Sequence, residues 1–181
     1  TLDMGVFELG VPVLGICYGM QLIAHLHGAP VQRCSQREYG RTDVHMDDTQ
    51  TGLLKGMKDH SQCWMSHTWQ VATPPEGFKA TAHTAHCPVA AMADPARRIY
   101  GVQFHPEVTH TEEGFALLQN FLKDICGLAG DWNMEAYAEI AVRQIREQVG
   151  DGTVLLGLSG GVDSAVAAAL LYRAIGSRLT C

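Results

Sequence analysis

The chain has 181 residues, of which 46% are hydrophobic and 18% are charged, and its formal net charge at pH 7 is −6. This composition excludes a disordered tail, and the 19 glycines and 7 prolines follow no collagen-like or low-complexity period. No apolar run approaches the roughly 20 residues of a membrane span, and an acidic balance argues against general nucleic-acid binding. We therefore expect a globular protein with no membrane or nucleic-acid partner, long enough for one domain and part of another.

The first residues and the cysteines indicate where the protein is located in the cell and whether the chain is a fragment. Residues 1–10 carry two acidic side chains and no basic cluster, so they do not resemble a signal peptide. The six cysteines are widely spaced and form no Cys-x-x-Cys pair. Without a secretory signal we expect free thiols and a cytoplasmic location. The absence of an initiator methionine favours an internal fragment.

The first 126 residues alternate between strand and helix signals. Segment 11–16 is a short apolar run typical of a strand buried on both faces, and segment 18–27 predicts a helix that ends at Gly28. Residues 31–104 are rich in Thr, Val and His and contain turn signals, so several short strands are predicted there, the last at 99–104.

A helix is predicted next, because Thr109 and Glu112 have the spacing of a capping box. Helical periodicity places four apolar side chains on one face of it, namely Phe115, Leu118, Leu122 and Ile125. We assign residues 1–126 to a first domain.

Residues 127–133 read as a linker, with two glycines followed by Asn133 as a candidate helix N-cap. Residues 134–181 then read as the start of a second α/β domain. An amphipathic helix is predicted over 134–149, a strand over 154–158 and a helix over 165–175.

Cys17 lies between the first predicted strand and its helix, with Gly15 and Gly19 on either side. Glycines allow the sharp turn of a nucleophile elbow, which would expose the sulfur at the carboxyl end of a parallel sheet. The helix N-terminus would favour a thiolate and offer N–H groups to an oxyanion. From this segment alone, a buried structural cysteine is an equally good interpretation.

The segment His105-Pro-Glu107 follows the strand predicted at 99–104. A histidine at the carboxyl end of a strand can face a nucleophile on the neighbouring strand, and Glu107 can accept the second imidazole N–H. Together with Cys17 this order of nucleophile, base and acid favours acyl transfer through a thioester.

A glycine-rich loop, residues 159–164 (SGGVDS), joins the strand and helix of the second domain. Its backbone N–H groups and the helix N-terminus can hold an anion, and Ser159 and Ser164 can donate to phosphate oxygens. Asp163 would repel bare phosphate, so we expect it beside Mg²⁺. The loop lacks the lysine of a Walker A motif, which favours a grip on pyrophosphate over transfer of a γ-phosphate.

These motifs resemble known families. Segments 15–21 (GICYGMQ) and 101–107 (GVQFHPE) are similar to the two signatures of class I glutamine amidotransferases, and segment 158–164 is similar to that of ATP pyrophosphatases. In tandem they resemble the family of glutamine-hydrolysing GMP synthetases. The resemblance implies an amidotransferase-like open α/β sheet, incomplete at its N-terminus, followed by the start of a parallel α/β domain of the adenine-nucleotide alpha-hydrolase type.

The resemblance also implies roles for particular residues. Cys17 would be the glutaminase nucleophile, His105 the general base and Glu107 the third member of the triad. The implied ATP-binding residues are Ser159, Gly160, Gly161, Val162, Asp163, Ser164 and Ala165, and the implied glutamine-binding residues are Gly15, Gln21, Ser66 and His67.

The family is a ligase of purine biosynthesis that hydrolyses glutamine and uses the ammonia, ATP and Mg²⁺ to convert XMP to GMP, AMP and pyrophosphate. The complete enzyme would be a homodimer. This chain by itself is expected to be inactive, because it lacks the family's first strand and most of the synthetase domain.

Three alternatives stay open at this point. The family pattern Ser-His-Gly-Asp is replaced here by Ser66-His67-Thr-Trp-Gln, so His67 is either a glutamine contact or a loop histidine packed by Trp64 and Trp69. The chain could serve another ATP-dependent amidotransferase, or be a module without catalysis.

His83-x-x-His86-Cys87 predicts no zinc site, because a strand would point the two histidines to opposite faces.

Overall fold

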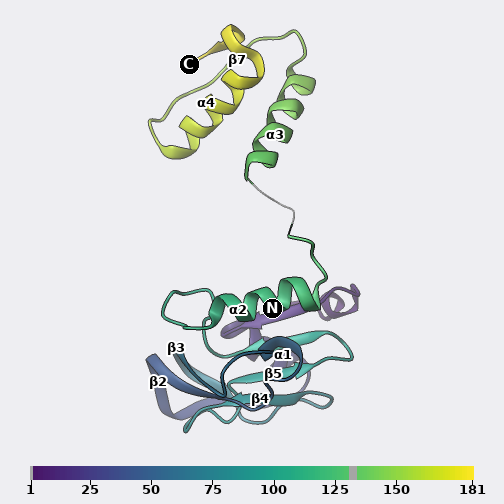
Figure 1. Cartoon of the computed structure of the whole chain (residues 1–181), viewed down its shortest axis with the longest axis vertical. Coiled ribbons are helices and arrows are strands. Elements are labelled where there is room, and N and C mark those ends of the chain that lie inside the picture. The colour runs from purple at the N-terminus through teal and green to yellow at the C-terminus, as the bar shows by residue number, and fades with distance from the viewer. Residues whose placement is uncertain (1, 131–133) are drawn as a thin grey trace. The chain divides into compact units, whose positions relative to one another are not determined.

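The structure is a computed structural model that describes residues 2–130 and 134–181 (Figure 1). It forms two compact units, Thr1–Ala129 and Gly130–Cys181. Asn133 and the rest of segment 131–133 of the predicted linker lie outside the described residues.

The first unit is built on a six-stranded mixed sheet with the strand order β1-β6-β5-β4-β2-β3. Only β1 and β6 are parallel, and the other neighbours are antiparallel. The parallel arrangement expected at the cysteine is present as the β1–β6 pair, which lies within a mixed sheet. The strands are β1 (Val13–Ile16), β2 (Val31–Met46), β3 (His60–Val71), β4 (Lys79–His83), β5 (Ala91–Asp94) and β6 (Ile99–Val102).

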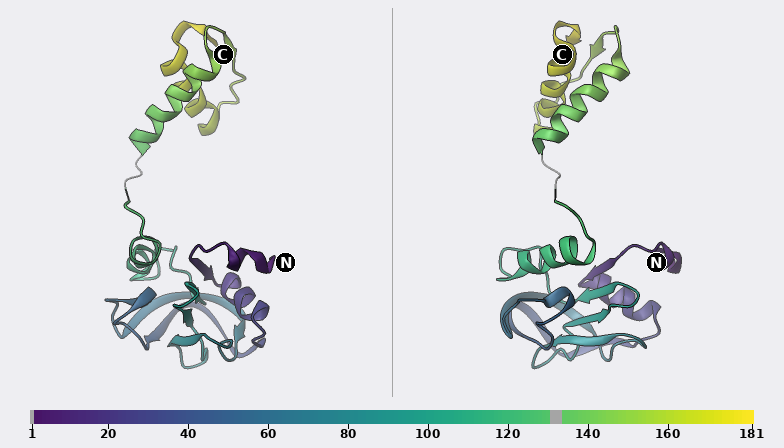
Figure 2. Two further views of the ribbon diagram at one scale, coloured as in Figure 1. Left: turned by 90° about the vertical axis from the view of Figure 1, so that its right-hand side faces the viewer. Right: turned by 45° about the vertical axis from the view of Figure 1, so that its right-hand side comes forward.

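Strands β2 and β3 are long and curved rather than short (Figure 2). Their pairing shifts register between Arg33 and Glu38, and this irregularity lets one continuous strand bend. Val44 is buried while Asp43 is exposed, so one face of β2 meets the core and the other meets water. Many polar residues of β2 lie on the outer face of this ribbon.

Helices cover both faces of the sheet at β1 and β6. Helix α1 (Tyr18–Leu26) packs with Val13 of β1, whereas Leu14 packs with the cluster that contains Leu117 of α2 (Gly114–Gln119). This alternation explains the unbroken apolar run, because successive side chains of β1 enter cores on opposite faces. Short 3-10 helices η1 (Met4–Glu8) and η2 (Gly52–Leu54) complete the unit.

The helix predicted after Thr109 forms, but its start and its buried face differ from the prediction. It begins at Gly114 without a side-chain cap, so the predicted capping box is wrong. Its second half, η3 (Asn120–Ile125), is a π-helix in which Cys126 N–H donates to Phe121 O at 2.8 Å. Phe115 lies in the α-helical first half and is 79% exposed. The residues that face the core are Leu117, Leu118, Phe121 and Ile125, while Leu122 is exposed.

The described part of the second unit, residues 130 and 134–181, contains two α-helices, one 3-10 helix and a pair of parallel strands. Its elements are α3 (Met134–Val149), β7 (Val154–Leu155), α4 (Val162–Ile175), η4 (Gly176–Arg178) and β8 (Leu179–Thr180). Helix α4 begins three residues earlier than predicted, because Gly161 already takes the extended conformation of an N-cap. Among the described residues, no helix is long and apolar enough to cross a membrane.

Candidate active site

Cys17 is the single residue between β1 and α1. Its backbone has φ 51° and ψ −106°, a conformation that residues with a side chain rarely adopt. Its N–H donates to Val102 O of β6 at 2.8 Å. A Cβ added to Gly15 would lie 2.6 Å from the Gly19 carbonyl carbon, whereas one added to Gly19 would meet nothing within 4 Å. The predicted elbow is present, and packing requires Gly15 but not Gly19.

His105 and Glu107 follow the carboxyl end of β6, the parallel neighbour of β1. Since Cys17 follows β1 directly, both segments leave the sheet at the same edge. His105 Nδ1 lies 2.6 Å from Glu107 Oε1. A carboxylate only accepts hydrogen bonds, so Nδ1 carries the hydrogen and Nε2 is free to accept a proton. Glu107 thus orients the imidazole as the sequence predicted.

Contacts from β3 and α2 hold the His-Pro-Glu turn. His105 N–H donates to Trp64 O at 3.0 Å, and the buried Thr111 hydroxyl donates to His105 O at 2.6 Å. A Cβ on Gly114, the first residue of α2, would overlap the carbonyl oxygen of Pro106. The absence of a side chain at position 114 therefore lets the helix start directly against the turn.

The Cys17 thiol is not activated in this structure. Burial raises its pKa, and the negative charge of Glu107 acts in the same direction. The backbone N–H of Tyr18 and the amide of Gln103 lower the pKa, but burial outweighs them. The Tyr18 N–H at the start of α1 lowers the pKa of Cys17, as expected for a helix N-terminus, but burial raises this pKa by more. A base must therefore remove the proton for the sulfur to react.

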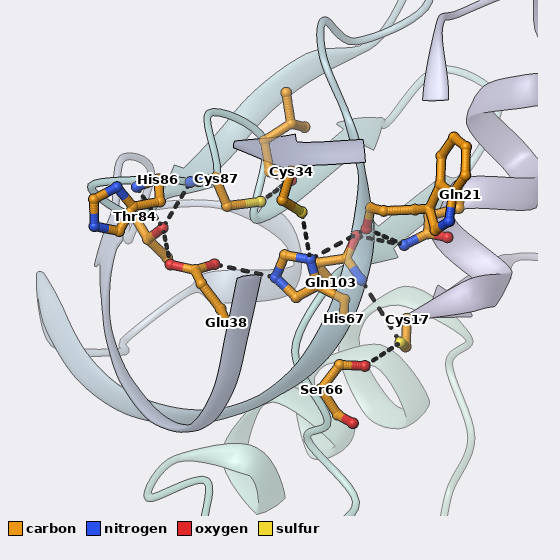
Figure 3. Close-up of polar contacts among 12 residues, drawn as sticks. Cys17, Gln21, Cys34, Glu38, Ser66, His67, Thr84, His86, Cys87 and Gln103 are labelled. Atoms are coloured by element: carbon orange, nitrogen blue, oxygen red, sulfur yellow. Dashed lines mark hydrogen bonds and ion pairs between the residues drawn. The ribbon is translucent and has the colours of Figure 1, made fainter. Parts of the chain in front are cut away.

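Two glutamines lie beside the thiol, and Figure 3 shows both. Gln103 is completely buried, and its Nε2 lies 3.6 Å from Cys17 Sγ. Gln21 Nε2 donates to Gln103 Oε1 at 3.0 Å and to Trp69 O at 2.6 Å. The side-chain amide of Gln21 is thus engaged within the protein. Its donors hold Gln103 in the orientation that presents N–H to sulfur.

Ser66 and His67 lie on β3 and face different surroundings. The Cys17 thiol lies 4.0 Å from the Ser66 carbonyl oxygen, the acceptor to which it points. The side chain of His67 turns away into a buried site, where its Nε2 contacts Glu38 Oε2 at 3.0 Å (Figure 3). Its Nδ1 contacts Cys34 Sγ at 3.3 Å. His67 is therefore a buried strand residue and not a loop histidine, and its Nδ1 also contacts Trp69 O at 3.1 Å.

Glu38 anchors this buried group. Burial opposes ionisation of its carboxyl, but hydrogen bonds from His67 and Thr84 prevail, and its pKa lies below the ordinary value. Thr84 Oγ1 donates to Glu38 Oε1 at 2.6 Å and accepts from the N–H of Cys87 at 2.8 Å. Hydrogen bonds thus lead from the loop after β4 through Glu38 and His67 to Trp69 O, which also accepts from Gln21 beside the thiol.

The structure separates the members of the rejected zinc motif. His83 ends β4 and contacts a carboxylate oxygen of Asp47 at 3.0 Å, while Cys87 lies with Glu38 and His67. His86 lies in the loop beyond β4, so the opposite faces of one strand are not the reason for the separation.

In the second unit, segment 159–164 connects β7 to α4. Ser159 Oγ donates to Ser164 Oγ at 3.1 Å, and Ser164 Oγ donates to Gly161 O at 3.0 Å. Gly160 has φ +81°, which favours glycine. Asp163 lies in the exposed first turn of α4. The loop therefore has the strand-loop-helix setting of an anion-binding turn.

Known proteins share both the sequence and the fold of the first unit. Residues 1–125 match the family "Glutamine amidotransferase class-I". The chain belongs to this family. A protein of Thermoplasma acidophilum, provisionally named as one subunit of GMP synthase, is 32% identical, with a TM-score of 0.64 over 75% of this chain and 63% of that one. A Thermotoga maritima glutamine amidotransferase, 20% identical with a TM-score of 0.53 over 95% of this chain and 66% of that one, shares the fold.

Curated relatives of this amidotransferase match both units. The chain is 53% identical over 179 residues to a GMP synthase (glutamine-hydrolyzing) of Acetivibrio thermocellus, and 57% identical over 184 residues to that of Albidiferax ferrireducens. These matches cover 99% and 97% of this chain but only 35% and 34% of the relatives. Residues 135–180 match the NAD synthase family. The predicted fold class of both parts is confirmed.

Sequence reasoning about the amidotransferase site missed Gln103 as a site residue. Its position carried a usable signal, because it is a polar residue immediately after a strand that is buried throughout. It also missed Glu38 and Thr111, whose roles depend on contacts with segments that are remote in the sequence.

Proposed function

We propose that this chain is the amidotransferase part, with the beginning of the synthetase part, of a glutamine-hydrolysing GMP synthase. The observation that carries the proposal is the identity of more than half to GMP synthases across both units. In this proposal the first unit releases ammonia from glutamine, and the second site uses ATP and the ammonia to convert XMP to GMP, AMP and pyrophosphate.

In this proposal Cys17 and His105 carry out the chemistry at the first site. His105 Nε2 accepts the Cys17 proton, and the sulfur attacks the side-chain carbonyl carbon of glutamine. The tetrahedral intermediate collapses as His105 returns the proton to the leaving nitrogen, which departs as ammonia and leaves a thioester. Water, activated by His105, then cleaves the thioester to glutamate and the free thiol. In this proposal, N–H groups at the start of α1 stabilise the oxyanion.

The second site is proposed to bind the pyrophosphate part of ATP through residues 159–165. The fit rests on the strand-loop-helix setting and on two hydroxyls that can exchange their internal bonds for phosphate oxygens. Asp163, on the first turn of α4, would support Mg²⁺ directly or through ATP. The ion would neutralise charge on the departing pyrophosphate.

Glutamine contacts by Gly15, Gln21, Ser66 and His67 also belong to the proposal, although the side chains of Gln21 and His67 are bonded within the protein in this structure. The Ser66 backbone supports this role, because it lies against the thiol. A homodimeric assembly in the cytoplasm accompanies the GMP synthase assignment, and analytical ultracentrifugation of the complete enzyme would test the dimer.

The test is an assay of the complete enzyme that contains this chain. With XMP, ATP, Mg²⁺ and glutamine we expect GMP, AMP and glutamate in equal amounts, measured by chromatography. Glutamate release without GMP under any condition would contradict the synthase assignment while leaving the amidotransferase intact.

Substitution in the second unit separates the two sites further. Asp163→Ala should lower GMP formation about a hundred-fold or more with either glutamine or ammonia, because the metal and pyrophosphate are misplaced. Glutaminase activity should survive. Asp151→Ala, at another exposed aspartate of the same unit, is the matched control and should leave both activities unchanged.

A further inference from the structure

Three histidines form a row across three neighbouring strands of the first unit, on the outer face of the sheet. His45 of β2 pairs directly with His60 of β3 on one side and with His83 of β4 on the other. Directly paired residues point to the same face, so all three imidazoles meet there. The centroid of the His45 ring lies 3.9 Å from that of His60 and 4.9 Å from that of His83.

Two carboxylates flank the row. Asp43 lies two positions before His45 on β2 and therefore on the same outer face. Asp47 lies just beyond the end of β2, two positions after His45. The inner-face residues between them, Val44 and Met46, are buried. His60 Nδ1 lies 3.4 Å from Asp43 Oδ2, and His83 Nδ1 lies 3.0 Å from Asp47. The side chains at these five positions are therefore all imidazoles or carboxylates, namely Asp43, His45, Asp47, His60 and His83.

We propose that Asp43, His45 and His60 form a binding site for a divalent transition-metal ion of the zinc or nickel type. One ligand atom from each residue lies within 4.8 Å of the other two. Imidazole nitrogen with carboxylate oxygen is a donor set that suits Zn²⁺, Ni²⁺ and Cu²⁺. The side chains of Asp43 and His60 are about half exposed, so small rotations can close the ligands around an ion that keeps water in its open positions.

His83 has a supporting role in this site. Its ring is nearly parallel to that of His45, with an interplanar angle of 15°, and its Nδ1 is engaged by Asp47. The stacked ring restricts rotation of His45 and so presets one ligand. The proposed site is separate from Cys17, His105 and Glu107, and its occupation does not depend on the proposed function.

Titration of the 181-residue chain with Co²⁺ tests the proposal. We expect one bound ion per chain, with visible d–d bands and without the intense near-ultraviolet band of a cobalt–thiolate bond. His45→Ala and His60→Ala should each weaken binding at least about ten-fold, the scale at which even outer partners of a metal site act. His83→Ala should have a smaller effect.

The control is His25→Ala, at an exposed histidine of α1 outside the row, which should bind Co²⁺ like the unmodified chain. Circular dichroism verifies folding, and Asp43→Asn, which keeps the side-chain size, replaces any alanine variant that fails to fold. A thiolate band, equal affinities of all variants, or no binding to the unmodified chain would each overturn the proposal.

Discussion

Gln103 Nε2 lies 3.6 Å from Cys17 Sγ, although 86 positions separate the two residues in the sequence. The contact arises because β1 and β6 are parallel neighbours and both residues follow the buried ends of these strands. Gln103 donates an N–H to the sulfur, and a donor stabilises a thiolate more than a thiol. The amide therefore works against the burial that raises the pKa of Cys17.

Replacing Gln103 by leucine should raise the pKa of Cys17 further. A hydrogen bond to a charged group contributes about 1.5–3 kcal/mol, so we expect the midpoint of Cys17 alkylation by iodoacetamide to move up by about one pH unit or more. Mass spectrometry of the alkylated peptide measures the midpoint for this cysteine alone.

Glu107→Gln provides a control of opposite sign. Removing the negative charge that raises the pKa of Cys17 should move the alkylation midpoint to lower pH. If the alkylation midpoints of both variants moved in the same direction, general disruption of the site, and not the two electrostatic contacts, would set the pKa of Cys17.

Cys17→Ala in the complete enzyme should abolish glutamine-dependent synthesis of GMP and leave ammonia-dependent synthesis largely intact. The reason is that the nucleophile is needed only to release ammonia. A glutamine-analogue electrophile should label Cys17 before Cys34, Cys63, Cys87 or Cys126. Equal loss of both activities, or first labelling of another cysteine, would refute the assignment.

The two glycines that flank Cys17 should respond differently to alanine. Gly15→Ala places a Cβ 2.6 Å from the backbone of α1, so we expect a loss of about 1–3 kcal/mol or more in the free energy of unfolding. Gly19→Ala meets open space on a helix and should be neutral or stabilising by up to about 1 kcal/mol. Urea unfolding followed by the fluorescence of Trp64 and Trp69 measures both. Equal destabilisation would contradict the packing described for the elbow.

The Glu38–His67 pair should make the stability of the first unit depend on acid pH. The folded-state pKa of Glu38 lies below its ordinary value of 4.5, so its ionisation stabilises the fold above pH 4.5. That contribution is lost as the pH falls through the lower, folded-state pKa. Glu38→Gln should cost about 1–3 kcal/mol at pH 7, and the difference from the unmodified chain should shrink in acid.

The matched control for this pH dependence is Asp43→Asn, which changes a carboxylate of the same strand on its exposed face. Urea unfolding at pH 7 and in acid should show little difference between this variant and the unmodified chain. A constant deficit of Glu38→Gln at every pH would assign its effect to packing instead of charge.

The elements near Cys17 were predictable because their patterns are local. The apolar run of β1, the glycine before the cysteine and the polar segment after β6 each indicate their structure within a few residues. The orientation of His105 by Glu107 was likewise predictable, since the two residues are two positions apart. The strand-loop-helix setting of segment 159–164 follows from its own strand, glycines and helix.

Only the tertiary structure decided what depends on contacts between distant segments. The antiparallel pairing of β2 and β3 brings His67 to Glu38, and the strand order brings Gln103 to Cys17 and His45 to His60 and His83. The pKa of Cys17 depends on burial by several elements at once, so no local pattern could set its direction. Hydrogen bonding, burial and charge act through space, whereas sequence periodicity reports only which face of one element is apolar.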